Sequence, residues 1–314
     1  MLPSFLIIGA MKAATTTLFR DLGLNPEVFV PEDKEPDSLT SDGIHSLAGM
    51  AAYRALFARA RPGQCCGEAS TAYTKRPRHE GVALRARRVL GADLKLIYLI
   101  RDPVDRIISQ HHHWVVYGLA SANIDEEVRS NPEYLAFSRY AWQLEPWLAE
   151  FPRDQICILK FEDYMAHRRE TVDHVSQFIG VSPRGDLVDP SRNYNPSSNR
   201  RIPRGKLRRL ARSPFYRRRI RPLLSWRMRE LARSLLPRAP SRPPAPSADT
   251  AAWLTAELAD DVARVAGILG KGDPPWDRWR GLLGEGEAVS TNADARPSAP
   301  EWSTDIPGAA KGKA

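Results

Sequence analysis

Residues 5–18, FLIIGAMKAATTTL, join a short apolar run to a hydroxyl-rich stretch that carries a single lysine. The run Phe5–Ile8 ends at Gly9, and Lys12, three threonines and a helical pattern closing near Gly23 follow it. This order is typical of a strand, a phosphate loop and a helix. Such a loop directs backbone N–H groups and a helix N-terminus at an anion, and the lysine adds a mobile positive charge. An ordinary strand-to-helix turn with a surface lysine is the alternative.

The spacing in this loop differs from that of a nucleotide triphosphatase. A triphosphatase loop has the pattern G-x-x-x-x-G-K-[ST]. Here Lys12 precedes the threonines with only Gly9 ahead of it, and the sequence contains no Gly-Lys-Ser/Thr. The loop therefore predicts phosphate binding of another kind.

A second stretch, residues 94–113, reads LKLIYLIRDPVDRIISQHHH. Its apolar half predicts a buried strand, and the proline suits the first turn of a following helix. Arg101 then ends the strand and Ser109 lies two turns into the helix, so both can face the crevice where α/β sheets bind ligands. A guanidinium and a hydroxyl suit a second phosphate group. Arg-Asp-Pro alone is equally compatible with a helix cap and a salt bridge.

Strands and helices alternate along the rest of the chain. A third strand is predicted at 155–160, and helices are predicted at 51–61, 134–151, 170–179 and 250–269. The alternation favours an α/β fold of P-loop type, in which helices flank a parallel sheet on both faces.

Together the two motifs resemble those of the sulfotransferases that use 3′-phosphoadenosine 5′-phosphosulfate. GAMKAATTTL (9–18) resembles their 5′-phosphosulfate loop, G-x-x-K-x-G-T-[TS]-x-L, and Arg101 with Ser109 matches the Arg and Ser that hold the 3′-phosphate. Further agreement in order and spacing comes from KEPDSL (34–39), GEASTAY (67–73), RYAWQLEPWLAEFP (139–152) and LKFEDY (159–164). The subgroup resembles bacterial relatives of the heparan sulfate glucosaminyl sulfotransferases.

The resemblance implies transfer of a sulfo group from this donor to a hydroxyl or amine of a carbohydrate, glycolipid or natural product. It implies that Lys12 stabilises the leaving group and that Glu35 is the general base, which can act at neutral pH if partial burial raises its pKa. The expected donor contacts are Gly9, Lys12, Ala13, Ala14, Thr15, Thr16, Thr17, Arg101, Ser109, Arg200 and Arg201, and the expected acceptor contacts are Lys34, Glu68 and Tyr73.

Alternatives exist for two of these carboxylates. Glu35 could be an exposed loop residue paired with Lys34, and Glu68 could stabilise a loop. No metal is expected, because this transfer needs no divalent ion to bridge a polyphosphate. The triplet His111–His113 does not change this, since adjacent helical positions are about 100° apart and cannot share one ion.

Two positions depart from the family pattern. Ala14 stands where the family usually has glycine, and its Cβ would crowd a phosphate if the residue adopts a positive φ. KEPDSL also lacks the histidine and aromatic residues of the family's K-E-P-H-[FY]-F, so Asp37, Ser38 and Leu39 alter the pocket beside Glu35. The acceptor therefore does not transfer by resemblance.

The positive charge of the chain is concentrated in one segment. The net charge of the 314 residues is +9, yet residues 200–242 hold 16 basic residues and one acid. The remainder is acidic, which argues against a nucleic-acid partner. One or two amphipathic helices with solvated arginines are predicted here, and contact with an anionic or membrane surface is the alternative.

One sulfotransferase domain is predicted over residues 1–283. It includes the basic helical insertion 200–242 and a proline-rich linker at 237–248, and residues 284–314 are predicted to be a disordered tail. The other functional hypotheses are a nucleotide-dependent phosphotransferase and a non-catalytic polyanion- or lipid-binding protein on the same fold.

Cysteine content and apolar runs indicate the compartment. The three cysteines lack a disulfide or metal-binding pattern, which favours a reducing environment. No apolar run reaches the roughly 18 to 20 residues of a membrane span, and the first residues lack a signal-peptide pattern. We expect a cytoplasmic, bacterial protein whose partner is a small-molecule or glycan acceptor, with peripheral contact at the inner membrane as the alternative.

Overall fold

The computed structural model describes residues 1–192 and 245–280. Within these ranges five strands form one sheet in the order β2-β3-β1-β4-β5, and all neighbouring strands are parallel. The strands are β1 (Phe5–Gly9), β2 (Val28–Phe29), β3 (Cys65–Ala69), β4 (Lys95–Ile100) and β5 (Ile156–Lys160). Because helices cover both faces, the central strands are buried on each side, which explains their continuous apolar sequences. The predicted α/β fold is confirmed.

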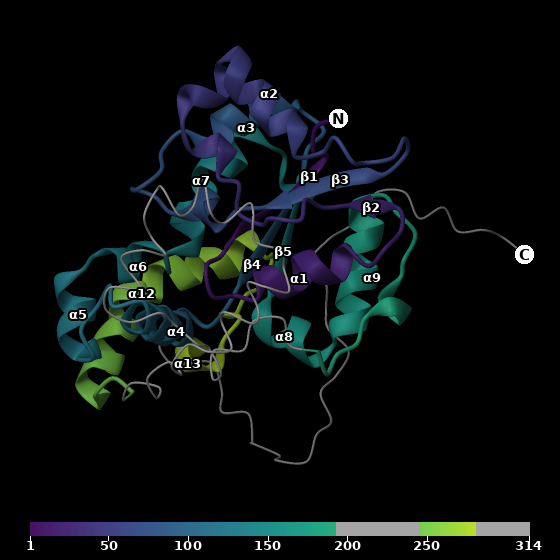
Figure 1. Cartoon of the computed structure of the whole chain (residues 1–314). Helices are drawn as coiled ribbons and strands as arrows, with labels where there is room; N and C mark the ends of the chain where they lie inside the picture. Colours follow the sequence, from purple (N-terminus) through teal and green to yellow (C-terminus); the bar gives the residue numbers. More distant parts are fainter. Residues whose placement is uncertain (193–244, 281–314) are drawn as a thin grey trace, which may run out of the picture.

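Helices flank the sheet on opposite sides (Figure 1). On one side α1 (Thr15–Leu22) packs against α9 (Arg168–Phe178). On the other side α7 (Tyr140–Glu150) contacts α3 (Val82–Leu90) and α12 (Ala248–Ile268). The C-terminal part of the described chain therefore packs onto the main sheet domain.

Shorter elements complete the described structure. The other α-helices are α2 (Leu47–Ala55), α4 (Pro103–Val116), α5 (Ile124–Ser130), α6 (Glu133–Ala136), α8 (Phe161–Ala166) and α13 (Asp277–Arg280). Turns of 3₁₀-helix lie at Ser38–Thr40, Asp42–His45, Thr71–Thr74, Arg153–Gln155 and Gly185–Leu187.

Two predicted helices have different bounds in the structure. The helix predicted at 51–61 begins at Leu47, because the Ser46 side chain caps it by accepting the N–H of Gly49, and it ends at Ala55. The helix predicted at 134–151 is divided into α6 and α7. Asp261 of α12 accepts the N–H groups of Ala141 and Trp142 and so caps α7 at its start, a contact that the local sequence does not reveal.

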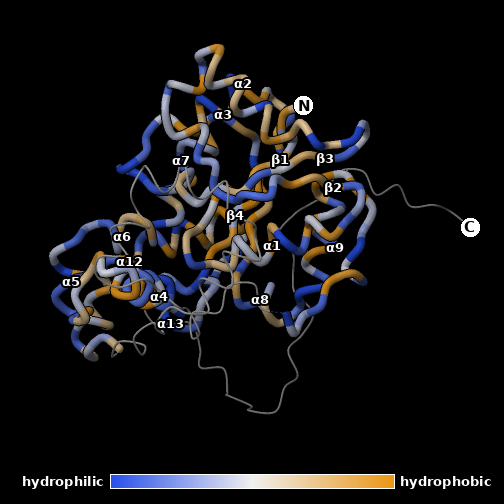
Figure 2. The backbone as a smooth tube through the Cα atoms, in the orientation of Figure 1, coloured by the Kyte–Doolittle hydropathy of each residue, from blue (hydrophilic) through white to orange (hydrophobic). Residues whose placement is uncertain are grey.

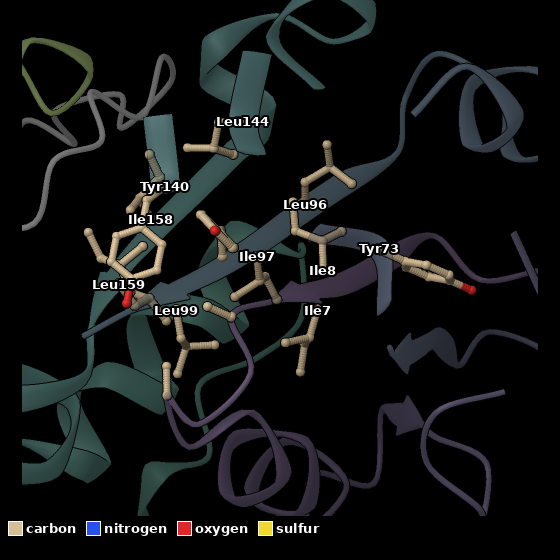
Figure 3. Packing of buried hydrophobic residues seen from close by; sticks show 14 of the residues in the cluster. Ile7, Ile8, Tyr73, Leu96, Ile97, Leu99, Tyr140, Leu144, Ile158 and Leu159 are labelled. Carbon is tan, nitrogen blue, oxygen red and sulfur yellow. The ribbon is translucent and has the colours of Figure 1, made fainter. Parts of the chain in front are cut away.

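The apolar core is centred on β1, β4 and β5. Figure 2 shows the central strands as the most hydrophobic part of the chain. In Figure 3, Ile7 and Ile97 lie beside each other, as their pairing across β1 and β4 requires. Tyr140 and Leu144 of α7 pack over the sheet, and the Tyr140 ring meets that of Tyr98 edge to face at 6.0 Å.

The carboxyl ends of β1 and β4 are adjacent at the point where the chain direction across the sheet reverses. From β1 the chain crosses towards β2, whereas from β4 it crosses towards β5. The N–H of Ala10, just beyond β1, donates to the carbonyl of Leu99 in β4 at 2.7 Å. Open parallel sheets bind ligands at such a switch point.

Some sequence-based predictions fall elsewhere. The basic segment 200–242, the tail 284–314 and most of the linker 237–248 lie outside the described residues. Within the described ranges, no helix combines the length and the apolar character needed to cross a membrane.

Candidate active site

A cavity of ≈ 520 Å³ opens at the switch point between β1 and β4. It is lined from the loop after β1, from the segment after β2, from the turn after β3, and from α4 and α8. The lining residues are Met11, Lys12, Ala14, Thr15, Thr16, Thr17, Lys34, Glu35, Thr71, Lys75, Arg101, Ser109, His113, Tyr117, Phe161 and Met165. Most of the residues predicted to bind the sulfo donor thus line one cavity. The predicted base Glu35 and the predicted acceptor contact Lys34 line the same cavity.

Backbone strain is concentrated in the loops that form and adjoin this cavity. In the described part of the chain, the non-glycine residues with positive φ are Lys12 (74°), Ala14 (64°), Glu35 (64°) and Asp37 (54°). A left-handed conformation costs an ordinary residue about 1–2 kcal/mol. Strain of this kind persists where the surroundings enforce it, and it gathers at functional sites.

The loop after β1 has the geometry of an anion-binding turn. Positive φ at Lys12 and at Ala14 alternates with ordinary φ at Ala13 between them, a pattern typical of backbone concavities that bind anions. Ala14 occupies the N-cap of α1, and no side chain caps this helix end. The positive end of α1 therefore opens into the cavity.

Gly9 and Ala13 act through packing. A Cβ on Gly9 would lie 2.0 Å from Oγ1 of Thr74, which donates to the carbonyl of Ile8, so only glycine fits here. Ala13 is fully buried in the core. Neither residue is among those that line the cavity.

Arg101 presents an unsatisfied donor at the β4 side of the cavity. Its guanidinium lies over the Phe161 ring, 4.5 Å from the centroid, and Nη1 is 3.5 Å from the Lys12 carbonyl. Its Nε is buried without a hydrogen-bond partner in the described structure. Ser109 lines the same cavity from α4. An anionic group bound here would supply the acceptor that Nε lacks.

Glu35 lies on the other side of the cavity, fixed to the end of β3. Its N–H donates to the Ala69 carbonyl at 2.9 Å. Its Oε1 accepts from Lys34 Nζ at 2.7 Å and from Thr71 Oγ1 at 3.1 Å. The Glu35 side chain is 46% exposed and lines the cavity, so it remains accessible although it pairs with Lys34.

The ionisation of Glu35 differs from the expectation. Burial raises the pKa of this carboxyl, but the charges of Lys34 and Lys75 and the hydrogen bonds from Lys34 and Thr71 lower it further, to below its ordinary value of 4.5. The condition stated from the sequence, a Glu35 pKa raised by partial burial, is therefore not met. With a pKa below 4.5, Glu35 is ionised at neutral pH, and the two cations beside it favour this charged form.

The assignment of Glu68 and Tyr73 to the acceptor site is corrected by their burial. The exposed fractions of Glu68 and Tyr73 are 0% and 2%, and neither lines the cavity. Tyr73 and Tyr53 donate to Glu68 Oε1 at 2.6 and 2.9 Å. Burial raises the pKa of Glu68 to about 7, although these hydrogen bonds oppose the rise.

This buried network supports the segment that carries Glu35. Ser70 Oγ donates to Glu68 Oε2 at 3.3 Å and accepts the N–H of Asp37 at 3.1 Å. Tyr73 Oη accepts the N–H of Leu39. Glu68 thus stabilises a loop, which was the alternative given for it.

Several cavity residues were missed by the sequence reasoning. Lys75 follows the GEASTAY segment, and burial lowers its pKa although the charges of Glu35 and Asp37 raise it. Thr71 and Phe161 lie inside segments that match the family, but nothing in their residue type marks them. His113 and Tyr117 reach the cavity from the last turns of α4.

Other predicted features fall outside this cavity. Arg200 and Arg201 lie outside the described residues. His111 is buried, and its Nε2 contacts the Ser121 carbonyl at 3.1 Å. Across 1–192 and 245–280 no group of three His, Cys, Asp or Glu side chains is arranged to hold a metal ion.

The fold and the residues of the cavity agree with a known protein family. A family model described as the sulfotransferase domain matches residues 2–216, and the chain belongs to this family.

Carbohydrate sulfotransferase 15 of Mus musculus is 25% identical over 268 residues, which cover 64% of this chain and 48% of that protein. Heparan sulfate glucosamine 3-O-sulfotransferase 3B1 of Mus musculus is 28% identical over 192 residues, which cover 57% of this chain and 46% of that protein. The chain spans about half the length of these relatives.

The fold also matches a solved structure. The crystal structure of a sulfotransferase from Alicyclobacillus acidocaldarius superimposes with a TM-score of 0.61 at 24% identity, covering 89% of this chain and 99% of that chain. This likeness shows the fold.

Proposed function

We propose that the protein transfers a sulfo group from 3′-phosphoadenosine 5′-phosphosulfate to a hydroxyl or amine of a carbohydrate acceptor. The observation that carries this proposal is the convergence of Lys12, Arg101, Ser109 and Glu35 on one cavity. Membership of the sulfotransferase domain family supports the reaction type.

Two separate cationic positions suit the two charged ends of this donor. Lys12, the hydroxyls of Thr15 to Thr17 and the open end of α1 lie after β1 and suit the 5′-phosphosulfate. Arg101 and Ser109 lie after β4 and suit the 3′-phosphate. The unsatisfied Nε of Arg101 fits an anionic partner, and a donor with two charged groups would occupy both positions.

The reaction assigns a task to each side of the cavity. The acceptor oxygen or nitrogen bonds to sulfur while the bond from sulfur to the 5′-phosphate oxygen breaks. Glu35 accepts the proton from the acceptor, and Lys12 stabilises the charge that develops on the departing oxygen. Because Glu35 is ionised at neutral pH, it is ready to accept this proton.

A carbohydrate is the acceptor class that the relatives favour. The two mouse relatives are named for carbohydrate and heparan sulfate acceptors. Lys34 and Lys75 line the acceptor side together with Glu35 and Thr71, so this side offers both donors and acceptors of hydrogen bonds. A glycolipid or a glycosylated natural product would satisfy the same contacts. The cytoplasmic location stays a prediction.

A transfer assay tests the proposal. The full chain is incubated with sulfur-labelled donor and a panel of oligosaccharides, glycolipids and amino sugars, and labelled product is separated from donor. We expect labelled product from the native chain, and loss of about 10²-fold or more in rate for Lys12→Ala. Transfer that persists unchanged in Lys12→Ala would contradict the assigned site. Failure of the native chain to label any acceptor in the panel would count against the proposed reaction.

A further inference from the structure

Residues far beyond the 2–216 family match contact the turn that carries Arg101. Arg101 and Asp102 connect β4 to α4, and Asp102 caps α4 by accepting the N–H of Asp105 at 3.0 Å. Arg278, from the C-terminal part of the described chain, contacts Asp102 in this turn directly, and Trp276 contacts Glu162, which itself binds the turn. The segment 247–280 therefore bears directly on the geometry of Arg101.

Trp276 acts on this turn through Glu162. Glu162 Oε1 accepts the backbone N–H of Asp102 at 3.0 Å, and its Oε2 accepts the indole N–H of Trp276 at 3.2 Å. The indole is 5% exposed. Both oxygens of the carboxylate are thus engaged, and the second one holds the side chain in the orientation that the first requires.

The Trp276 ring also supports the other side of the turn. It lies 5.9 Å from the ring of Tyr140, centroid to centroid. The Tyr140 hydroxyl donates to the Arg101 carbonyl at 2.8 Å and lies 3.4 Å from the Arg101 backbone nitrogen, whose N–H it accepts. The backbone on both sides of the Arg101 side chain is therefore held by groups that contact Trp276.

Arg278 offsets negative charge beside Arg101. Its Nε donates to Asp102 Oδ2 at 3.2 Å, and its Nη2 donates to Asp105 Oδ1 at 3.5 Å. The other oxygen of Asp105 is 4.0 Å from Nη2 of Arg101. Without Arg278, the charges of Asp102 and Asp105 would lose this cationic partner, and Asp105 would compete more strongly with a bound anion for the Arg101 guanidinium.

We propose that Arg278 and Trp276 are positioning residues for the donor's 3′-phosphate, so that segment 247–280 supports the donor site from outside the cavity, although it lies outside the family match. The inference rests on the proposed function. Neither residue lines the cavity. Trp276 fixes the backbone at Arg101, and Arg278 leaves the Arg101 guanidinium available to the phosphate.

Affinity for two nucleotides separates this role from a merely structural one. Calorimetric titration of the full chain with 3′-phosphoadenosine 5′-phosphate and with adenosine 5′-phosphate gives the ratio of their dissociation constants. We expect Arg278→Ala to lower this preference for the 3′-phosphate by about five- to tenfold, with little change for adenosine 5′-phosphate. Arg278→Lys keeps the charge and should recover part of the preference.

A matched control lies on the same short helix. Arg280 pairs with Asp277 at 3.0 Å, whereas Asp102 and Asp105 pair with Arg278, so Arg280→Ala should keep the preference of the native chain. Trp276→Phe keeps an aromatic side chain, although a smaller one, and removes the N–H to Glu162. It should raise the KM for the donor several-fold while kcat at saturating donor changes little.

The outcomes separate the inference from the function on which it rests. A native chain that prefers the 3′-phosphate, with the same preference in Arg278→Ala and in Trp276→Phe, would overturn the inference and leave the proposed function intact. An equal loss of affinity for both nucleotides would show a structural role only and would also overturn it. A native chain without preference for the 3′-phosphate would contradict the proposed donor itself.

Discussion

Lys34 Nζ lies 2.7 Å from Oε1 of Glu35, and this ion pair lowers the pKa of the proposed base. Lys75 adds a second positive charge, and together they outweigh the effect of burial on the Glu35 pKa. The site therefore keeps a carboxylate charged beside the acceptor by surrounding it with cations, and the charge of the base and that of its neighbours are coupled.

Removing one of these cations should shift the pH dependence of turnover. A base with a lowered pKa is active above that pKa and loses activity as pH falls through it, so the acidic limb of the native kcat/KM profile should lie below pH 4.5. Lys75→Met should move this limb to higher pH, because Glu35 loses a cation that lowers its pKa. Lys95→Met is the control, because Lys95 lies at the start of β4, at the end of this strand away from the cavity. It should leave the acidic limb at the same pH. If the acidic limb does not shift in Lys75→Met, the group that titrates in this profile is not Glu35.

Glu35→Gln should remove proton transfer and retain donor binding. The amide preserves the size of the side chain, and loss of a general base typically costs about 10²- to 10⁴-fold in rate. Single-turnover kinetics measures the rate, and calorimetry with 3′-phosphoadenosine 5′-phosphate should give an affinity within about twofold of the native value. A variant with near-native turnover would show that another group accepts the proton.

Ala14→Gly should stabilise the protein. Ala14 has a φ of 64°, and glycine adopts this conformation without the steric cost of Cβ, so the free energy of unfolding should rise by about 0.5–1 kcal/mol. Ala13→Gly is the matched control: its φ is not positive and its methyl group is buried, so stability should fall. Urea denaturation measures the change in the free energy of unfolding of each variant. A decrease in both variants would show that the backbone at Ala14 is not strained.

Glu68→Gln should flatten the pH dependence of stability. The folded-state pKa of Glu68 is raised to about 7, so between pH 4.5 and 7 the folded state binds more protons than the unfolded state. Stability therefore falls as pH rises through this window, by up to about 3 kcal/mol from this group. Denaturation at several pH values checks this, and an equally steep fall in Glu68→Gln would assign the dependence to other groups.

The sequence predicted the parts of the structure that local pattern controls. β1, β4 and β5 are largely apolar runs, and the residues singled out by spacing, Lys12 with the threonines and Arg101 with Ser109, line one cavity. Ala14 was suspected of needing a positive φ, and the structure gives it one.

Tertiary contacts account for what the sequence did not reveal. The break between α6 and α7 is fixed by Asp261, more than a hundred residues away in the chain. The burial of Glu68 depends on two tyrosines that close over it, and the lowered pKa of Glu35 depends on Lys75 from another segment. Residue type and spacing along the chain do not predict such long-range partners.

The measurement that bears most directly on the central claim is calorimetric titration with 3′-phosphoadenosine 5′-phosphate and adenosine 5′-phosphate, on the native chain and on Arg101→Ala, at moderate ionic strength. We predict tight binding that requires the 3′-phosphate in the native chain, and loss of that requirement in Arg101→Ala. Equal affinity of the native chain for the two nucleotides, or a preference that survives in Arg101→Ala, would contradict the assignment of the donor site.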